Sequence, residues 1–138
     1  SLGYPAPAAE KALLLGEARR GLLPRLQPLL EHRELALIQA EVPKVRVSDA
    51  LVDYLLRLVE ATRSQPQFAW GLSPRASLAL LAAAKAWAFL AGRDSVIPED
   101  IQAVLPSVVG HRLREQADPA GHGGGALVQW LLREVPAL

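Results

Sequence analysis

One stretch, residues 71–92 (GLSPRASLALLAAAKAWAFLAG), constrains the fold more than any other part of the chain. Ser73 suits the N-cap of a helix, Pro74 suits its first position, and Gly92 suits the left-handed residue that ends it. Between these marks almost every residue is apolar, so the pattern predicts one helix without a polar face. Such a helix is normally wrapped by other elements. We therefore expect an all-α bundle with this helix at its centre.

Arg75 is the exception in the first turn of this helix. A helix N-terminus favours anions, so a cation there is unfavourable by roughly a few tenths of a kcal/mol unless an anion joins it. Arg75 and the free N–H groups of the turn would together make a site for a phosphate. The alternative is a surface side chain, or a partner of Asp94 or Glu99.

Composition agrees with a helical domain and excludes several kinds of chemistry. Cysteine is absent, so there are no disulfides, thiolates or cysteine-based zinc sites. The 15 basic and 14 acidic residues nearly balance, which gives no electrostatic argument for nucleic acid or an anionic membrane. The longest apolar run is far short of the ~20 residues that span a bilayer. Because the chain starts without Met, we expect an excised fragment of a larger cytoplasmic protein.

The rest of the chain predicts shorter elements around the central helix. We expect helices at residues 8–15, 34–41, 49–64, 98–105 and 126–135, further turns at 107–114, and a short extended segment near 45–47. Helix 49–64 is strongly amphipathic, with Leu55 and Leu58 on its apolar stripe and Val52 and Leu56 widening it. Pro106 is expected to interrupt the helix that begins at 98.

Several conspicuous residues favour structural roles. Arg63 is expected in a structural salt bridge, and Arg93 and Asp94 in a local ion-pair loop. Trp70 and Trp87 are expected to fill the core. Trp130 is a candidate exposed contact to a missing domain, and His111 is expected to bond the last carbonyls of a helix or to pack. The three histidines, His32, His111 and His122, lack metal-ligand spacing. The glycine-rich segment 121–125 predicts a linker, since no strand precedes it and no Lys-Ser/Thr follows.

Residues 71–113 carry four short motifs in a fixed order: G-x-S-P-R-A, A-x-x-x-G-R-D, P-E-D and H-R-L. With LVEATR at 58–63 and LGYP at 2–5, they make the chain resemble MoxR-type AAA+ ATPases over nearly its whole length. The resemblance implies the C-terminal helical lid, which follows an α/β domain that carries the Walker A and B motifs. Neither Walker motif occurs in this sequence.

The resemblance implies a domain order and a site. Residues 1–7 would be the hinge from the missing α/β ATPase core, 8–115 the lid, 116–125 a Gly-rich linker and 126–138 a C-terminal helix. The family's sensor-2 arginine falls on Arg75, which would act in ATP sensing and hydrolysis with Ser73 beside it. Gly3 and Tyr4 would line the adenine side of the same site. ATP, with Mg in the parent protein, is the implied cofactor; the fragment alone should bind none tightly and hydrolyse none.

The implied partners are the chain's own ATPase core, neighbouring subunits of a hexameric ring and von Willebrand factor A domain proteins, and the implied function is chaperone-like remodelling of protein complexes. Neither nucleic acid nor membrane insertion is expected. The main alternative is a stand-alone helical module that binds proteins and shares only lid ancestry. A helical DNA-binding domain is weaker, because the charge is near neutral and no basic stripe is present. The sequence departs from the family at Ile97, where a Thr or Ser normally precedes P-E-D, and the missing cap hydroxyl costs about 1 kcal/mol.

Overall fold

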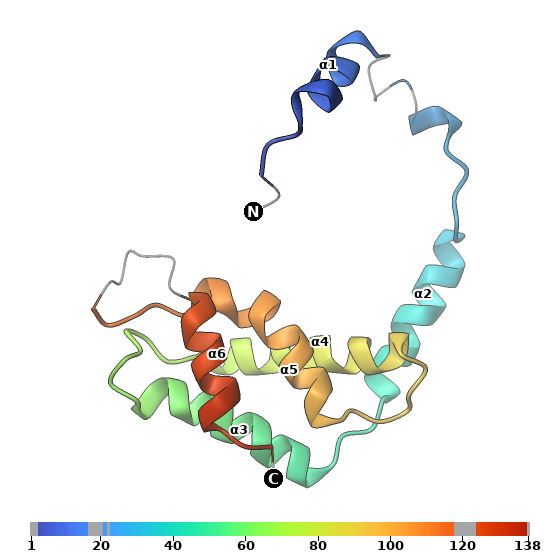
Figure 1. Cartoon of the computed structure of the whole chain (residues 1–138). Coiled ribbons are helices and arrows are strands. Elements are labelled where there is room, and N and C mark those ends of the chain that lie inside the picture. Colours follow the sequence, from blue (N-terminus) through green and yellow to red (C-terminus); the bar gives the residue numbers. More distant parts are fainter. Residues whose placement is uncertain (1–2, 17–20, 22, 118–123, 138) are drawn as a thin grey trace. The chain divides into compact units, whose positions relative to one another are not determined.

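A computed structural model of the chain describes residues 3–16, 21, 23–117 and 124–137, in which six α-helices lie (Figure 1). These are α1 (Pro7–Leu15), α2 (His32–Glu41), α3 (Asp49–Ser64), α4 (Pro74–Leu90), α5 (Pro98–Val109) and α6 (Gly124–Glu134). Short 3-10 helices, η2 (Leu23–Arg25), η3 (Val42–Lys44) and η4 (Gly110–Arg112), lie between them. The described ranges contain no strand, so the all-α prediction is confirmed. None of the described helices is both long and apolar enough to cross a membrane.

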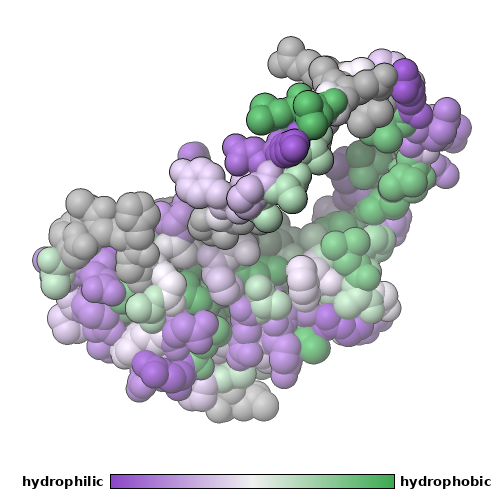
Figure 2. Space-filling model, turned by 45° about the horizontal axis from the view of Figure 1, so that its top comes forward, coloured by the Kyte–Doolittle hydropathy of each residue, from purple (hydrophilic) through white to green (hydrophobic). Residues whose placement is uncertain are grey.

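The chain forms two compact units, residues 1–35 and 36–138, and each is treated by itself. The first unit contains α1, η2 and the start of α2. Every side chain that the structure describes in this unit is exposed, and hydrophobic side chains lie on its surface (Figure 2). Leu14 is 82% exposed and Leu29 is 99% exposed. The described part of this unit therefore has no core of its own, and its helices are short enough to be marginal without packing.

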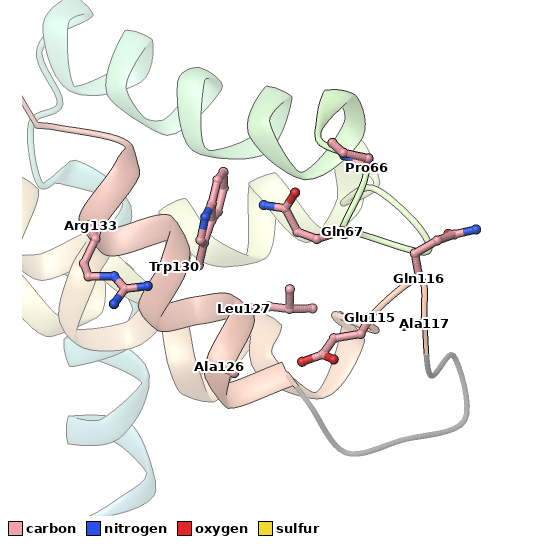
Figure 3. A pocket seen from close by; sticks show the side chains of 9 residues that line it. All are labelled: Pro66, Gln67, Glu115, Gln116, Ala117, Ala126, Leu127, Trp130 and Arg133. Carbon is pink, nitrogen blue, oxygen red and sulfur yellow. The ribbon is translucent and has the colours of Figure 1, made fainter.

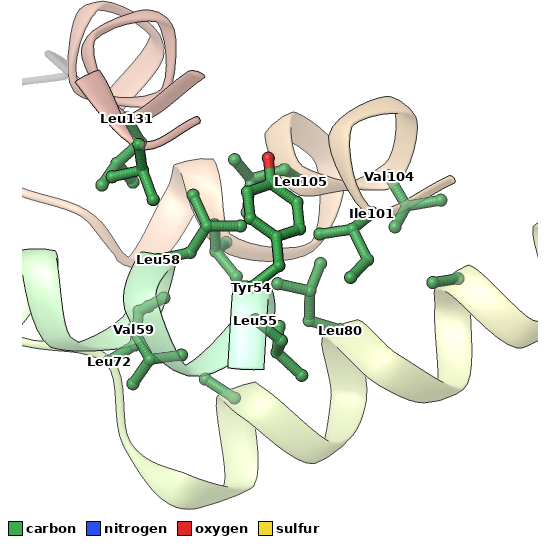
Figure 4. Packing of buried hydrophobic residues seen from close by; sticks show 14 of the residues in the cluster. Tyr54, Leu55, Leu58, Val59, Leu72, Leu80, Ile101, Val104, Leu105 and Leu131 are labelled. Atoms are coloured by element: carbon green, nitrogen blue, oxygen red, sulfur yellow. The ribbon is translucent and has the colours of Figure 1, made fainter. Parts of the chain in front are cut away.

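The second unit encloses the hydrophobic core between α3, α4, α5 and α6 (Figure 4). The most extensive contact joins α4 to α5, while α3 touches both of them and α6 packs on α5 and η4. The large side chains with no exposed surface include Tyr54, Leu58, Leu80, Ile101, Leu105 and Leu131. Because these residues come from all four helices, the core ties the four helices into one body.

Helix α3 has the predicted bounds and begins at a predicted cap. The Ser48 hydroxyl accepts a hydrogen bond from the Leu51 amide (3.3 Å). The predicted widening of its apolar stripe is wrong, because Val52 is 36% exposed and Leu56 is 54% exposed. Tyr54, which the periodicity did not single out, is fully buried, and its hydroxyl accepts a hydrogen bond from Gln102 on α5.

Helix α4 ends as predicted. Gly92 has a left-handed backbone (φ +72°), and the amides of Gly92 and Arg93 bond back to Phe89 and Ala88, the pattern of a Schellman motif. The expectation that α4 is wrapped on all sides is wrong among the described residues. Its fully buried residues form one line at i, i+4 spacing, and several large residues off that line are exposed, although Leu81 and Phe89 are partly buried against the core. The buried line is Ala76, Leu80, Ala84 and Ala88, whereas Leu78 is 70% exposed and Leu90 is 79% exposed.

Two tryptophans expected in the core lie largely outside it. Trp87 is 50% exposed because it stands off the buried line of α4, where alanines pack toward the core. Trp70 is 61% exposed in the loop that precedes α4. Trp130, expected as an exposed contact, is partly buried and packs against the core. Aromatic size alone therefore misplaced Trp70 and Trp87, and the expectation for Trp130 was wrong in the opposite direction.

Helix α5 continues through Pro106, contrary to prediction. The proline removes one backbone N–H, but Leu105 and Val109 on either side of it are fully buried. Their packing holds the last turn in place. Helix α6 begins at Gly124, two residues before the expected start, and a Cβ there would lie 1.9 Å from the Gly110 carbonyl oxygen. Glycine at 124 thus lets α6 approach η4, a packing role that the linker interpretation did not include.

The predicted extended segment is present as one isolated parallel bridge. Arg46 pairs with Ser95: its amide donates to the Asp94 carbonyl (2.9 Å), and its carbonyl accepts from the Val96 amide (3.0 Å). A second, antiparallel bridge joins Phe68 to residue 115. The first bridge lies just after α4 and the second just before it. Backbone hydrogen bonds therefore fix both ends of that helix to other segments of the chain.

Candidate functional site

The start of α4 is held by the last turn of α3. Thr62, which is buried, accepts a hydrogen bond from the Leu72 amide (2.9 Å) and donates one to the Val59 carbonyl (2.6 Å). Arg63 donates from Nε and Nη2 to the Leu72 carbonyl (3.1 and 2.9 Å). Two neighbouring side chains therefore take both backbone polar groups of the residue that precedes the α4 cap.

Gly71 makes room for this contact. A Cβ at position 71 would lie 2.4 Å from Arg63 Cγ and 2.9 Å from Arg63 Cα, so any larger residue would displace the arginine. The salt bridge predicted for Arg63 is wrong, because the side chain bonds a carbonyl and forms no ion pair with any residue that the structure describes. The A-T-R and G-x-S-P-R-A motifs are therefore two halves of one junction.

Ser73 has its predicted role as the cap of α4. Its backbone is extended (φ −74°, ψ 159°), and its hydroxyl accepts a hydrogen bond from the Ala76 amide (3.3 Å). Pro74 has no N–H, and the Ser77 amide bonds to the Ser73 carbonyl. The Arg75 amide has no acceptor within the described ranges, so it is the donor that this helix end leaves available.

The Arg75 side chain is exposed and has no hydrogen-bond or ion-pair partner among the described residues. The first turn of α4 contains no acidic residue. Asp94 pairs with Arg46 (2.7 Å), so the alternative in which Asp94 neutralises Arg75 is wrong. In the described part of the second unit, Arg133 is also without a partner, but it lies in the last turn of α6, where the dipole favours a cation. Within the described part of the second unit, Arg75 is thus the unpartnered arginine at an electrostatically unfavourable helix end.

This helix end presents donors of the kind that bind anions. A guanidinium presents a planar fork of donors that matches phosphate or carboxylate oxygens. The Arg75 amide points along the helix axis at the same end, where the helix dipole adds to the attraction. Gly3 and Tyr4, the other residues predicted to bind a nucleotide, belong to the first unit; Tyr4 is fully exposed there and Gly3 has a left-handed backbone. Their contribution to a shared site with Arg75 stays a prediction.

At the start of α5, neighbouring residues of the chain satisfy the free backbone donor and the charges. Asp100 is 2% exposed and accepts hydrogen bonds from Arg93 (2.7 Å) and from the Ile97 amide (2.9 Å). Burial alone would raise the pKa of Asp100, but these two bonds and the charge of Arg93 lower it below its usual range. The ion pair between Arg93 and Asp94 that the sequence suggested is therefore replaced by two pairs, Arg93 with Asp100 and Asp94 with Arg46.

A cavity of about 800 Å³ opens between the α3–α4 loop, residues 115–117 and α6 (Figure 3). Trp130 forms part of its wall and meets Phe68 edge to face, with ring centroids 5.7 Å apart. Neither Ser73 nor Arg75 lines this cavity. Across the described ranges, no group of three or more His, Cys, Asp or Glu side chains is arranged to hold a metal. His111 is exposed and accepts a bond from Arg112, and His122 lies outside the described residues.

Comparison with known proteins adds an independent line of evidence. A family model described as the AAA lid domain matches residues 60–129, which include the junction at Leu72, the start of α4 and all of α5. The chain is 39% identical over 123 residues to Chaperone MoxR1 of Mycobacterium tuberculosis, covering 82% of this chain and 32% of that protein. It is 34% identical over 134 residues to the uncharacterized protein YeaC of Bacillus subtilis, covering 97% of this chain and 41% of that protein.

A solved structure agrees with these relatives. The crystal structure of a candidate ATPase from Cytophaga hutchinsonii matches with a TM-score of 0.75 and 28% sequence identity. The match covers 98% of this chain and 44% of that one. The chain therefore spans less than half the length of the proteins it resembles. The residues that hold the start of α4, Thr62, Arg63 and Leu72, all fall within the family match.

Proposed function

Because the chain belongs to the AAA lid domain family, in its MoxR branch, we propose that it serves as the sensor-2 lid of an ATP-hydrolysing parent protein. In this proposal Arg75 contacts the γ-phosphate of ATP bound to a domain outside this chain. The observation that carries the proposal is the exposed Arg75 guanidinium, without a partner among the described residues, at the N-terminus of α4.

The residues at this helix end fit a phosphate group. The guanidinium and the Arg75 amide are both donors without a protein acceptor in the described ranges, and no carboxylate in the first turn competes for them. ATP would supply the phosphoryl group whose transfer depends mainly on positioning and charge stabilisation. Arg75 would supply positive charge and orientation, and Ser73 would fix the helix start from which Arg75 projects.

The junction between α3 and α4 supports a mechanical role. Thr62 and Arg63 bind both backbone polar groups of Leu72, and the Leu72 side chain is buried in the core. Arg75 therefore stands on a segment that moves with the whole second unit. A change in lid angle would then change the distance between Arg75 and the nucleotide, which is the hinge type of coupling.

We extend the proposal to the assembly. One relative is named a chaperone, and the parent of this chain would similarly remodel protein complexes. The proposed partners are its own ATPase core, neighbouring subunits of a hexameric ring and von Willebrand factor A domain proteins, in the cytoplasm. Gly3 and Tyr4 would contact the adenine side of the bound nucleotide.

The test compares ATP turnover and ATP affinity in the full-length parent for wild type and Arg75→Ala. Removing one charged donor to a developing oxyanion costs about a hundredfold in turnover, so a fall of this order is expected while the ring still assembles. Arg133→Ala is the matched control, because Arg133 is also an arginine without a partner among the described residues. Its turnover should stay within about twofold of wild type.

An unchanged turnover in Arg75→Ala would refute the sensor role and favour the alternative, a helical module that binds protein partners. If turnover falls, mixing Arg75→Ala subunits with subunits that cannot bind ATP separates two arrangements. Activity that recovers in the mixture means that Arg75 acts on the nucleotide of a neighbouring subunit. Activity that stays low means that it acts on the nucleotide of its own subunit.

A further inference from the structure

The cavity between the α3–α4 loop, residues 115–117 and α6 has mainly apolar walls. Its apolar lining residues are Pro66, Ala117, Ala126, Leu127 and Trp130. Phe68 meets the Trp130 ring edge to face, and the Gln67 side chain extends toward the same ring from the loop opposite (Figure 3). The volume of about 800 Å³ and the apolar walls with a few polar groups are typical of a binding site.

Glu115 is the acidic residue of this cavity. Its side chain is half-buried, is directed toward α6 in Figure 3, and has no hydrogen bond or ion pair among the described residues. Arg133 also belongs to the lining, but its side chain is exposed, lies on the other side of Trp130 in Figure 3 and forms no ion pair with Glu115. Because a carboxylate partly removed from water is unfavourable without a partner, a cation that reached Glu115 would be stabilised.

The aromatic wall adds to the preference for a cation. Tryptophan attracts an ammonium or guanidinium group more strongly than the other aromatic side chains do. Because Glu115 and Trp130 line the same cavity, an amphipathic cation can place its charge at the carboxylate and its apolar part against Trp130 and Leu127. Lysine and arginine, which carry a charge on a long apolar stem, have this form. Phosphate groups of a nucleic acid or a membrane do not, because the carboxylate would repel them.

We propose that this cavity binds an extended segment of a partner protein in which a lysine or arginine stands two positions from an apolar residue. Residues two positions apart in an extended segment face the same side, so the cation would reach Glu115 while the apolar side chain packs on Trp130. The rim residues Pro66, Gln116 and Ala117 are exposed, so the cavity is open. A small-molecule pocket encloses roughly 70–90% of its ligand, and an open cavity instead suits side chains carried by a larger molecule.

The proposed partner site is separate from the proposed ATP sensor. Neither Ser73 nor Arg75 lines this cavity, and all of its lining residues belong to the second unit. Loss of partner binding and loss of ATP turnover are therefore distinguishable results.

A purely structural role for Glu115 makes a different prediction. Figure 3 places this residue toward the start of α6, where the helix dipole favours an anion. If Glu115 served only to stabilise α6, its replacement would lower the free energy of unfolding and leave partner binding unchanged. Stability and binding must therefore be measured on the same variants.

The test measures binding of a fluorescent peptide, Gly-Ser-Arg-Ser-Leu-Ser-Gly, to the full chain by fluorescence anisotropy. Two control peptides carry Glu in place of Arg, or Ser in place of Leu, and free phenethylamine serves as a small amphipathic competitor. We expect saturable binding of the first peptide. Each control peptide should bind at least about fivefold more weakly, because one loses the attraction to Glu115 and the other loses the apolar contact.

A charge reversal tests the residue. Glu115→Lys should reverse the preference, so that the peptide with Glu binds more tightly than the peptide with Arg. Glu134→Lys is the matched control, because Glu134 is exposed on α6 and does not line the cavity. It makes the same change of charge and should keep the preference for the Arg peptide. Circular dichroism and urea denaturation check the fold and the stability of both variants.

The indole N–H signals in a two-dimensional NMR spectrum locate the bound peptide. The chain has three tryptophans, and Trp130→Phe identifies the signal of the one that lines the cavity. Adding the Arg peptide should shift the Trp130 signal and leave that of Trp87, which lies on α4 outside the cavity, unchanged.

The proposal is supported if binding needs both the Arg and the Leu of the peptide, shifts the Trp130 signal and reverses its charge preference in Glu115→Lys. It is overturned if no saturable binding occurs up to about 1 mM peptide, or if both control peptides bind as tightly as the first. A preference that stays the same in Glu115→Lys, with lower stability alone, would mean that Glu115 only stabilises α6. Competition by phenethylamine as strong as that by unlabelled peptide would make the cavity a small-molecule site and also overturns the proposal.

Discussion

The starts of α4 and α5 are built alike and completed differently. Each helix has proline in its first turn and an extended residue as its cap, and the two helices pack against each other. At α5, Asp100 returns to bond the Ile97 amide and also holds Arg93. At α4, the first turn has a cation and no acidic residue, and Arg75 contacts no other charged group in the described chain.

This difference separates a helix end that is satisfied within the chain from one for which we propose a functional role. The α5 end satisfies its own donors and charges, so it needs nothing from outside. The α4 end is complete only as a backbone cap: Ser73 satisfies one amide, and the charge of Arg75 adds to the positive end of the helix dipole. Arginine at this position does not stabilise the helix, because the helix dipole favours cations at the C-terminus. The cost is small, and it makes sense if an anion from elsewhere offsets it.

The largest expected effect on stability comes from removing the charge of Asp100 at the start of α5. Asp100→Asn keeps the shape of the side chain and one acceptor but removes the charge that faces Arg93. We expect a loss of about 2 kcal/mol in the free energy of unfolding, because hydrogen bonds to charged groups contribute more than neutral ones. Urea denaturation followed by tryptophan fluorescence measures this loss, since all three tryptophans lie in the second unit. A change near zero would show that the α5 end is not held by this carboxylate.

The pH dependence of the same variant is its control. The pKa of Asp100 is lower in the folded chain than in the unfolded chain, so its stabilisation is fully present above about pH 4. The stabilisation is lost as pH falls through the folded-state pKa. The stability difference between wild type and Asp100→Asn should therefore shrink below about pH 4. Arg46 also lowers the pKa of Asp94, so the difference between the two proteins is the quantity to follow, not the wild-type curve alone.

A smaller effect is expected from improving the cap of α5. Ile97 has no side-chain acceptor, and its backbone is extended (φ −113°, ψ 163°), a conformation that threonine also adopts. Ile97→Thr adds a hydroxyl that can accept an amide of the first turn, and we expect about 0.5–1 kcal/mol of added stability. Ile97→Val is the matched control, because it keeps the branched shape without the hydroxyl. Equal stability of the two variants would mean that Asp100 already completes this helix end.

Local signals predicted both helix starts from the sequence. Ser73, Pro74 and Gly92 mark α4 through backbone rules that depend on a few adjacent residues, and Pro98 marks α5 in the same way. Arg75 was singled out as a candidate for a related reason: its charge conflicts with its position in the helix. That conflict can be seen in one turn of sequence and needs no knowledge of the fold.

What the sequence did not predict depends on contacts between distant residues. Arg46 and Asp94 are separated by 48 positions, so no local pattern pairs them. Arg63 was singled out, but its partner is the Leu72 carbonyl, and every residue has a carbonyl. Hydrophobicity placed Trp87 in the core, yet the packing of α4 buries a line of alanines and leaves the larger ring half exposed. Helix periodicity identifies a face, and only the neighbouring helices decide how wide that face is.

The smallest expected effect on stability comes from a change that also separates stability from function most directly. Arg75→Glu replaces a cation with an anion at the N-terminus of α4, so the isolated chain should gain about 0.5 kcal/mol, and Arg75→Gln, which only removes charge, should gain less. In the parent protein the same Arg75→Glu change should lower ATP turnover at least as much as Arg75→Ala does, because a carboxylate repels phosphate. Chemical denaturation of the chain and turnover of the parent give the two readouts. A residue kept for packing loses stability and activity together, whereas a residue kept for an external anion gains stability as activity falls. If Arg75→Glu destabilises the isolated chain, Arg75 has a structural role at this helix end, and the contrast with α5 is not functional.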